Sequence, residues 1–164
     1  MKRGILVGTI TSFALASLLV GNVNHAASAK TRVTKTPTAQ SIVIALRSHG
    51  LPIGKITSYS ASNDPNKLLG RPGYYISKTN FIDKRVKEPI SDGIDVINGG
   101  SVEVFANVTN AKTRYIYLTT VEKSIPMLAE YDYIDRNVLL RISNDLTPKQ
   151  AKQYQMTLKK VLGH

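Results

Sequence analysis

Apolar residues recur every three or four positions in three parts of this chain, which predicts three helices. The first is expected to begin at Thr36-Pro37, because threonine caps a helix and proline fits its first position. Gly50 is expected to end it in a Schellman turn that brings Leu51 onto Leu46, and Pro52 prevents its continuation. Its apolar side is formed by Ile42, Val43, Ala45 and Leu46.

The second and third helices are predicted from their ends as well as from their apolar stripes. Asn110 is expected to cap the second helix, and Pro126 to end it. Thr147 is expected to cap the third, with Pro148 at its first position and Gln150 completing a capping box. The stripe of the second helix holds Ala111, Arg114, Leu118, Val121 and Ile125. The stripe of the third holds Ala151, Tyr154, Leu158, Val161 and Leu162.

Stretches rich in β-branched and aromatic residues lie between these helices and predict strands. They cover residues 53–61, 74–82, a stretch from Val102 onward, 131–134 and 138–143. In the third of them Val102, Val104 and Ala106 alternate with Glu103, Phe105 and Asn107. That strand therefore has two distinct faces.

Turn-forming residues separate the strands. Residues 62–73 are dense in Ser, Asn, Asp, Pro and Gly and predict a structured loop. Residues 83–92 are expected to form an exposed connection, and residues 94–97 either a short edge strand or part of that connection. A turn is expected at Asn98-Gly99-Gly100, and another near residues 135–137.

The order of elements, α-β-β-β-α-β-α, predicts an α+β domain over residues 36–164. Such an order is typical of a mainly antiparallel sheet with helices packed on one face. A sheet of this kind leaves its other face or an edge available to partners.

The N-terminal 29 residues have the pattern of a cleaved secretory signal peptide. Lys2 and Arg3 precede the uncharged, largely apolar run 4–21, and Ala27-Ser28-Ala29 supplies small residues at a cleavage site. The alternative is a membrane anchor, although threonine and serine dilute the apolar run. We expect a secreted protein from Lys30, with residues 30–35 as a flexible basic leader and no stable membrane insertion after cleavage.

Charge and cysteine content narrow the class of protein. Removing Lys2 and Arg3 from the 22 basic residues leaves 20 against 11 acidic ones, a formal charge of +9. This charge favours anionic partners, and outside the cell those are wall polymers, lipid headgroups or acidic proteins rather than nucleic acid. The chain has no cysteine, which excludes disulfides and thiolate chemistry and is typical of a Gram-positive exporter.

Few residues offer catalytic chemistry. His49 is expected to cap the first helix through a free carbonyl, with a catalytic base as the alternative. Neither a metal nor a cofactor is expected, since no ligand spacing or phosphate-binding glycine loop is present. Glu103, Glu130 and Asp132 lie nearest the expected sheet ends, but their spacing does not show that they converge. Glu103 has a simpler interpretation as a residue on the solvent face of its strand.

Basic residues concentrate in the two terminal segments of the mature chain. If the terminal helices lie side by side, they make one positive face. The preferred binding surface is the loop from Asp64 to Gly73 with these helices beside it. There Asp64 and Asn66 order the loop, and an anionic partner is contacted by Lys67, Arg71 and Lys78.

About two-thirds of the chain resembles an uncharacterised family of exported proteins and lipoproteins of Gram-positive bacteria. The similarity lies in Asp64-Pro65-Asn66, residues 68–73, Ser77-Lys78, Phe81, residues 100–105, 127–131, 138–141, Leu146-Thr147-Pro148, Ala151 and Tyr154. The resemblance implies an exported single domain. It implies no reaction, and lipid anchoring does not carry over because the chain lacks the required cysteine.

Together these patterns predict a secreted, cell-envelope-associated binding protein without catalytic activity. Its partner is expected to be an anionic wall polymer or an extracellular protein. One alternative is a small exported hydrolase that uses Glu103 and Glu130. Another is an inhibitor or immunity protein that blocks an extracellular enzyme through an open sheet face.

Overall fold

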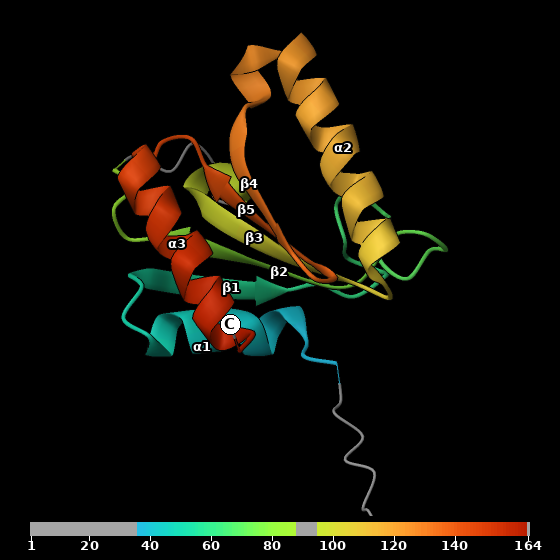
Figure 1. The fold of residues 1–164 in the computed structure, drawn as a ribbon, viewed down its shortest axis with the longest axis horizontal. Coiled ribbons are helices and arrows are strands. Elements are labelled where there is room, and N and C mark those ends of the chain that lie inside the picture. The colour runs from blue at the N-terminus through green and yellow to red at the C-terminus, as the bar shows by residue number, and fades with distance from the viewer. Residues whose placement is uncertain (1–35, 88–94, 164) are drawn as a thin grey trace, which may run out of the picture. The chain divides into compact units, whose positions relative to one another are not determined.

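The computed structural model describes residues 36–87 and 95–163, which build a five-stranded antiparallel sheet and three α-helices (Figure 1). The strands lie in the order β1-β2-β3-β5-β4, and every neighbouring pair is antiparallel. Their bounds are β1 Ile53–Ser58, β2 Tyr75–Asp83, β3 Gly99–Phe105, β4 Glu130–Asp135 and β5 Val138–Ser143. The helices are α1 Ala39–Ser48, α2 Val108–Ser124 and α3 Pro148–Val161. The α+β class and the antiparallel sheet predicted from the sequence are confirmed.

The sheet carries helices on both faces, so the prediction that they share one face is wrong. α1 and α3 contact each other and cover the face that presents Phe81, Val102, Val104, Leu140 and Ile142. The alternate positions Tyr75, Phe105 and Leu139 form a second apolar cluster on the opposite face. Ala111 and Leu118 of α2 cover this second cluster (Figure 1), because it too must be removed from water.

The predicted helix ends are confirmed at three places, one in each helix, and shifted at two. Gly50 ends α1 at a φ of 88°, with the Leu51 amide bonded to the Leu46 carbonyl. Ile125-Pro126 ends α2, and Thr147 with Gln150 forms the capping box of α3. His49 Nδ1 lies 2.8 Å from the Ala45 carbonyl oxygen, as expected of a capping imidazole.

The two shifted ends are both N-termini. α1 is capped by Thr38 rather than Thr36, because the Thr38 hydroxyl reaches the Ser41 amide. α2 is capped by Asn107 rather than Asn110, since the Asn107 side chain accepts the amide of Asn110. The capping residue thus lies two or three positions before or after the predicted one. At that position the backbone is extended and the side chain reaches a free amide of the first turn.

The segment before β3 also differs from the prediction. Val96–Asn98 forms a short 3₁₀ helix, and Gly99 and Gly100 belong to β3 rather than to a turn. Gly100 allows β3 to pass close to its neighbours: a Cβ there would lie 2.6 Å from both the Arg141 carbonyl oxygen and the Phe81 ring.

The predictions for residues 1–35, and those for 88–94 within the expected connection, fall outside the described residues. Within residues 36–87 and 95–163, none of the helices has the length and apolar character needed to cross a bilayer.

We predict that Gly100→Ala lowers the free energy of unfolding by about 1–3 kcal/mol, because its methyl group overpacks the contact between β3 and β5. The matched control is Gly54→Ala in β1, where the added Cβ meets its nearest atom at an ordinary 3.5 Å. Urea unfolding followed by circular dichroism measures both. Equal stability of the two variants would contradict the close approach at Gly100.

Candidate functional site

The turn-rich loop before β2 is organised around one buried carboxylate, that of Asp64. Its Oδ2 accepts hydrogen bonds from the Leu68 amide at 2.9 Å, the Leu69 amide at 3.1 Å and the Tyr75 hydroxyl at 2.7 Å. Its Oδ1 receives the Lys78 ammonium at 3.1 Å. Because Tyr75 and Lys78 lie on β2, these contacts fix the loop to the sheet.

The electrostatics of Asp64 agree with this geometry. Burial alone would raise the pKa of Asp64. The hydrogen bonds from Tyr75 and the Leu68 amide, with the charge of Lys78, outweigh burial and lower the pKa from 3.8 to about 2. Burial and the same hydrogen bond raise the pKa of Tyr75 well above its ordinary value. The Lys78 ammonium also lies 5.0 Å from the centroid of the Tyr59 ring, a cation–π distance.

Of the five residues predicted to bind a partner, the structure leaves three on the surface. Asn66, Lys67 and Arg71 are exposed, and Asn66 donates a 3.4 Å hydrogen bond to the Tyr75 hydroxyl. Asp64 and Lys78 are each only 3% exposed and bind one another. The prediction that Lys78 contacts an anionic partner is therefore wrong, because its buried ammonium is paired with the Asp64 carboxylate.

A groove of about 460 Å³ separates this loop from α2. Its lining residues are Leu68, Pro72, Gly73 and Tyr74 from the loop side and Thr113, Arg114 and Tyr117 from α2. Tyr74 is 40% exposed and Tyr117 58% exposed, so two aromatic rings are available at its rim. Arg114 lies 5.6 Å from the centroid of the Tyr117 ring.

The basic terminal helices α1 and α3 were predicted to lie beside the loop, but they do not lie beside this groove. Leu68 and Leu69 of the loop pack with α2 on one face of the sheet, whereas α1 and α3 cover the other. The reason is again strand alternation, because Tyr75, which anchors the loop through Asp64, faces α2.

Beneath α2 the sheet carries a layer of charged side chains. Glu103 at the centre of β3 is 0% exposed, and its carboxylate binds Arg114 Nε at 3.3 Å and Arg141 Nη1 at 3.1 Å. Arg141 also holds both oxygens of Glu130 at 2.9 Å. Glu103 is therefore not on a solvent-facing surface, and the acids whose convergence the sequence could not establish do converge.

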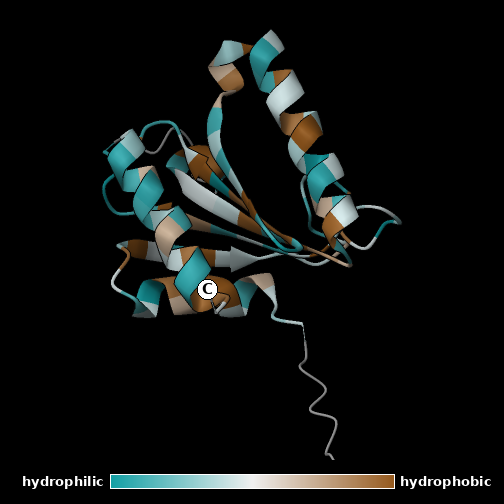
Figure 2. Ribbon diagram, in the orientation of Figure 1, coloured by the Kyte–Doolittle hydropathy of each residue, from teal (hydrophilic) through white to brown (hydrophobic). Residues whose placement is uncertain are grey.

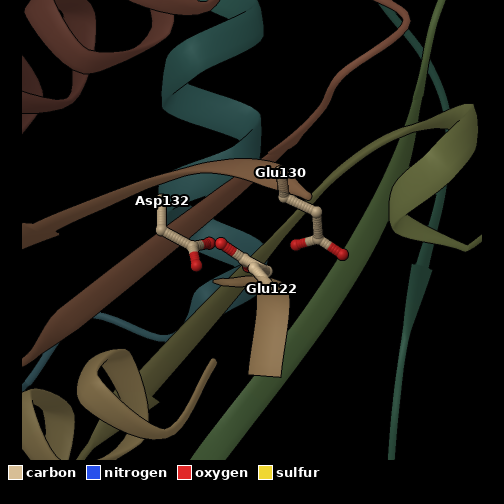
Figure 3. Close-up of side chains that lie close together, drawn as sticks. All are labelled: Glu122, Glu130 and Asp132. Atoms are coloured by element: carbon tan, nitrogen blue, oxygen red, sulfur yellow. The ribbon is translucent and has the colours of Figure 1, made fainter. Parts of the chain in front are cut away.

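Three carboxylates meet at the β4 side of this layer (Figure 3). Glu122 of α2 faces Glu130 and Asp132 of β4, and one oxygen from each lies within 4.8 Å of the others. Burial and the Glu130 charge, opposed by Arg141 and reinforced by Glu122, raise the pKa of Asp132 well above its usual range. Burial also raises the pKa of Glu130 despite its contact with Arg141. Among the residues that the structure describes, these oxygens form a group that could hold a metal ion.

Sequence reasoning did not identify Glu122, Arg114 or Arg141 as functional residues. The two-residue spacing of Glu130 and Asp132 was an available signal, because it places both on one face of a strand. The contribution of α2 had no such signal, since its position over the sheet depends on tertiary packing. No family model, curated protein or solved structure matches this chain.

We predict that Asp64→Asn lowers the free energy of unfolding by about 3–5 kcal/mol, because the change leaves the Lys78 ammonium buried without its counter-charge. Chemical denaturation measures the loss. Asn63→Ala, at an exposed neighbouring position, is the control and is expected to cost much less. Equal costs for the two variants would show that Asp64 does not anchor the loop.

The same carboxylate predicts a defined response to acid. The pKa of Asp64 is lower in the folded state than its ordinary value of 3.8, so the group stabilises the fold above about pH 4. This contribution is lost as the pH falls towards 2. Unfolding free energies measured between pH 5 and pH 2 should therefore fall more steeply for the wild type than for Asp64→Asn. Parallel curves would contradict the lowered pKa.

Proposed function

We propose that this protein is exported to the envelope of a Gram-positive bacterium and acts there as a binding protein without catalytic activity. The single observation that carries the proposal is the groove between the loop and α2, with Tyr74 and Tyr117 exposed at its rim. Concave sites with aromatic side chains and a few placed polar groups are the usual form of ligand sites. Export is supported by the signal-peptide pattern of residues 1–29.

The partner we propose is an anionic wall polymer. Lys67 and Arg71 lie exposed on the loop that forms one side of the groove, and the chain as a whole is strongly basic. Exposed cations attract a polyanion over a distance set by the salt concentration. Tyrosine rings beside them add contact area at low entropic cost, since a tyrosine side chain has few rotatable bonds.

The rigidity of the loop supports binding. Asp64 holds the Leu68 and Leu69 amides, so the backbone that lines the groove is ordered before a partner arrives. Pre-ordering reduces the conformational entropy lost on binding, which otherwise offsets part of the contact energy. The buried Asp64–Lys78 pair thus contributes to binding indirectly, through the shape of the loop.

The hydrolase alternative has less support. Glu103, one of its two acids, is fully buried and bound by Arg114 and Arg141, so it has no access to a substrate. Glu130, the other acid, lines a cavity of only about 180 Å³. A glycosidase acid must reach a glycosidic oxygen in a cleft that admits the polymer.

A protein partner is a second candidate, and a specific surface favours it. Ile116 and Tyr117 of α2 and Met127 and Leu128 of the following turn are exposed, Met127 by 87%. Methionine and aromatic residues are enriched at protein interfaces. The open sheet face that this alternative required is covered by α2 at Tyr75, Phe105 and Leu139, so a partner would contact the helix instead.

We predict that mature protein co-sediments with Gram-positive cell walls at low salt and that binding weakens at high salt. Reversing the loop charges with Lys67→Glu and Arg71→Glu should weaken binding about tenfold, since each rim charge is worth up to about 1 kcal/mol. Tyr117→Ala should weaken it further without changing the net charge. The bound fraction at each protein concentration measures these effects.

The matched control is the double variant Lys149→Glu with Lys152→Glu. It changes the net charge by the same amount at exposed positions of α3, across the sheet from the groove. Retained binding by this control supports the groove. Equal loss in both double variants would mean that total charge alone drives pelleting, and wild-type protein that does not pellet at either salt would end the wall-polymer proposal.

A further inference from the structure

The charged layer beneath α2 carries more negative than positive groups. Glu103, Glu122, Glu130 and Asp132 supply four carboxylates, and Arg114 and Arg141 supply two guanidinium groups. The nearby Lys78 does not change this balance, because its ammonium binds Asp64. With every group ionised the layer has two uncompensated negative charges, which matches the charge of one divalent cation.

The uncompensated groups are also the ones that lack hydrogen-bond donors. When both groups are ionised, both carboxylate oxygens of Asp132 and Oε1 of Glu122 are buried with no hydrogen-bond donor. In contrast, Glu103 and Glu130 each accept from arginine. Buried acceptors without a donor are uncommon in folded proteins, because each costs the free energy of removing it from water. The oxygens of Asp132 and Glu122 point towards each other, and one oxygen of Glu130 points towards them (Figure 3), so one ligand could satisfy these groups together.

We propose that Glu122, Glu130 and Asp132 form a binding site for one hard divalent cation, Ca²⁺ in preference to Mg²⁺. Carboxylate oxygens without sulfur or imidazole are the ligand set of hard cations. Two oxygens on one Ca²⁺ at about 2.3–2.6 Å lie at most about 4.6–5.2 Å apart, and each pair of these oxygens lies within 4.8 Å, so a small inward movement suffices for all three to bind one ion. Mg²⁺ requires shorter bonds of about 2.0–2.1 Å and a stricter octahedron, which three carboxylates from a helix and a strand satisfy less readily.

The surroundings allow the remaining ligands to be water. Of the three carboxylates, Glu130 lines the cavity of about 180 Å³, together with Ser143, Asn144, Met127 and Leu128. Glu130 keeps a second lone pair on each oxygen that Arg141 contacts, so it can bind an ion and the guanidinium together. A hydrated ion thus has space next to the cluster.

The proposed ion would strengthen the contact between two elements, α2 and β4, that already pack against each other. Glu122 lies in the last two turns of α2, beyond Leu118, the last buried apolar residue of that helix. Glu130 and Asp132 lie on β4, at the edge of the sheet. Three like charges in this position repel one another, whereas an ion between them holds the end of α2 against β4.

The test is calcium titration of the purified protein after chelator treatment. Isothermal calorimetry with CaCl₂ measures affinity, and thermal unfolding at constant ionic strength measures stabilisation. For wild type we expect one site per chain, and a rise in Tm of about 5–10 °C once Ca²⁺ exceeds its Kd by about 100-fold. Asp132→Asn and Glu122→Gln should each weaken Ca²⁺ binding at least about tenfold, since each removes a charged ligand.

These two variants are expected to remain folded without calcium, because each removes a repelling charge and retains the side-chain shape. Asp145→Asn, at an exposed acid outside the cluster, is the matched control and should keep the full calcium response. Absence of binding in wild type would overturn the site and would mean that Glu122 and Asp132 share a proton instead. A calcium response in Asp132→Asn and Glu122→Gln equal to that of wild type would also overturn it. Tighter binding of MgCl₂ than of CaCl₂ would overturn the choice of ion.

Discussion

The carboxylate of Glu103, buried at the centre of the sheet, holds α2 in its place. α2 buries few side chains, namely Ala111, Arg114 and Leu118, and Figure 2 shows hydrophobic and hydrophilic segments alternating along it. A helix with so narrow an apolar stripe gains little from hydrophobic burial alone. Its buried arginine meets Glu103, which Arg141 of β5 approaches from the other side. Removing Glu103 would leave the largely buried Arg114 guanidinium without its counter-charge, at a cost of about 3–5 kcal/mol.

Both candidate sites depend on this attachment. The groove lies between α2 and the loop that Asp64 anchors, and Arg114 itself lines it. The three carboxylates lie further along the same helix, where Glu122 meets Glu130 and Asp132. Within the described residues, the apolar core formed by α1, α3 and the opposite face of the sheet has no such buried ion pair between helix and strand. The face covered by α1 and α3 is thus mainly apolar, whereas the face covered by α2 holds the buried ion pairs and both candidate sites.

Local features of the fold could be predicted from the sequence. The capping box at Thr147 and Gln150, the glycine at position 50 and the proline at 126 act within a few residues, so neighbouring sequence is sufficient to predict them. Long-range features could not be predicted in this way. Alternation in β3 shows that Glu103 and Val104 face opposite sides, but it cannot show that both sides are covered. The partners of Glu103 lie 11 and 38 positions further along the chain.

The same limit explains the candidate sites. A turn-rich loop containing Asp64 was predictable, but its bond to Lys78 required the register of β2 against the loop, which only the fold supplies. Glu130 and Asp132 share a face by spacing alone, whereas Glu122 joins them only because α2 crosses above β4. When a sequence is interpreted alone, charged residues are usually expected on the surface. In this fold the charged residues that hold the loop and α2 in place are buried.

Hydrogen exchange in α2 tests the central claim most directly, that the Glu103 ion pairs hold this helix on the sheet. In Glu103→Gln the α2 amides should exchange about tenfold faster than in wild type or more, because the helix opens locally without unfolding of the domain. The α1 amides, on the opposite face, should keep their protection. Unchanged protection of α2 in Glu103→Gln would contradict the account, because the helix would then be held by its apolar contacts alone.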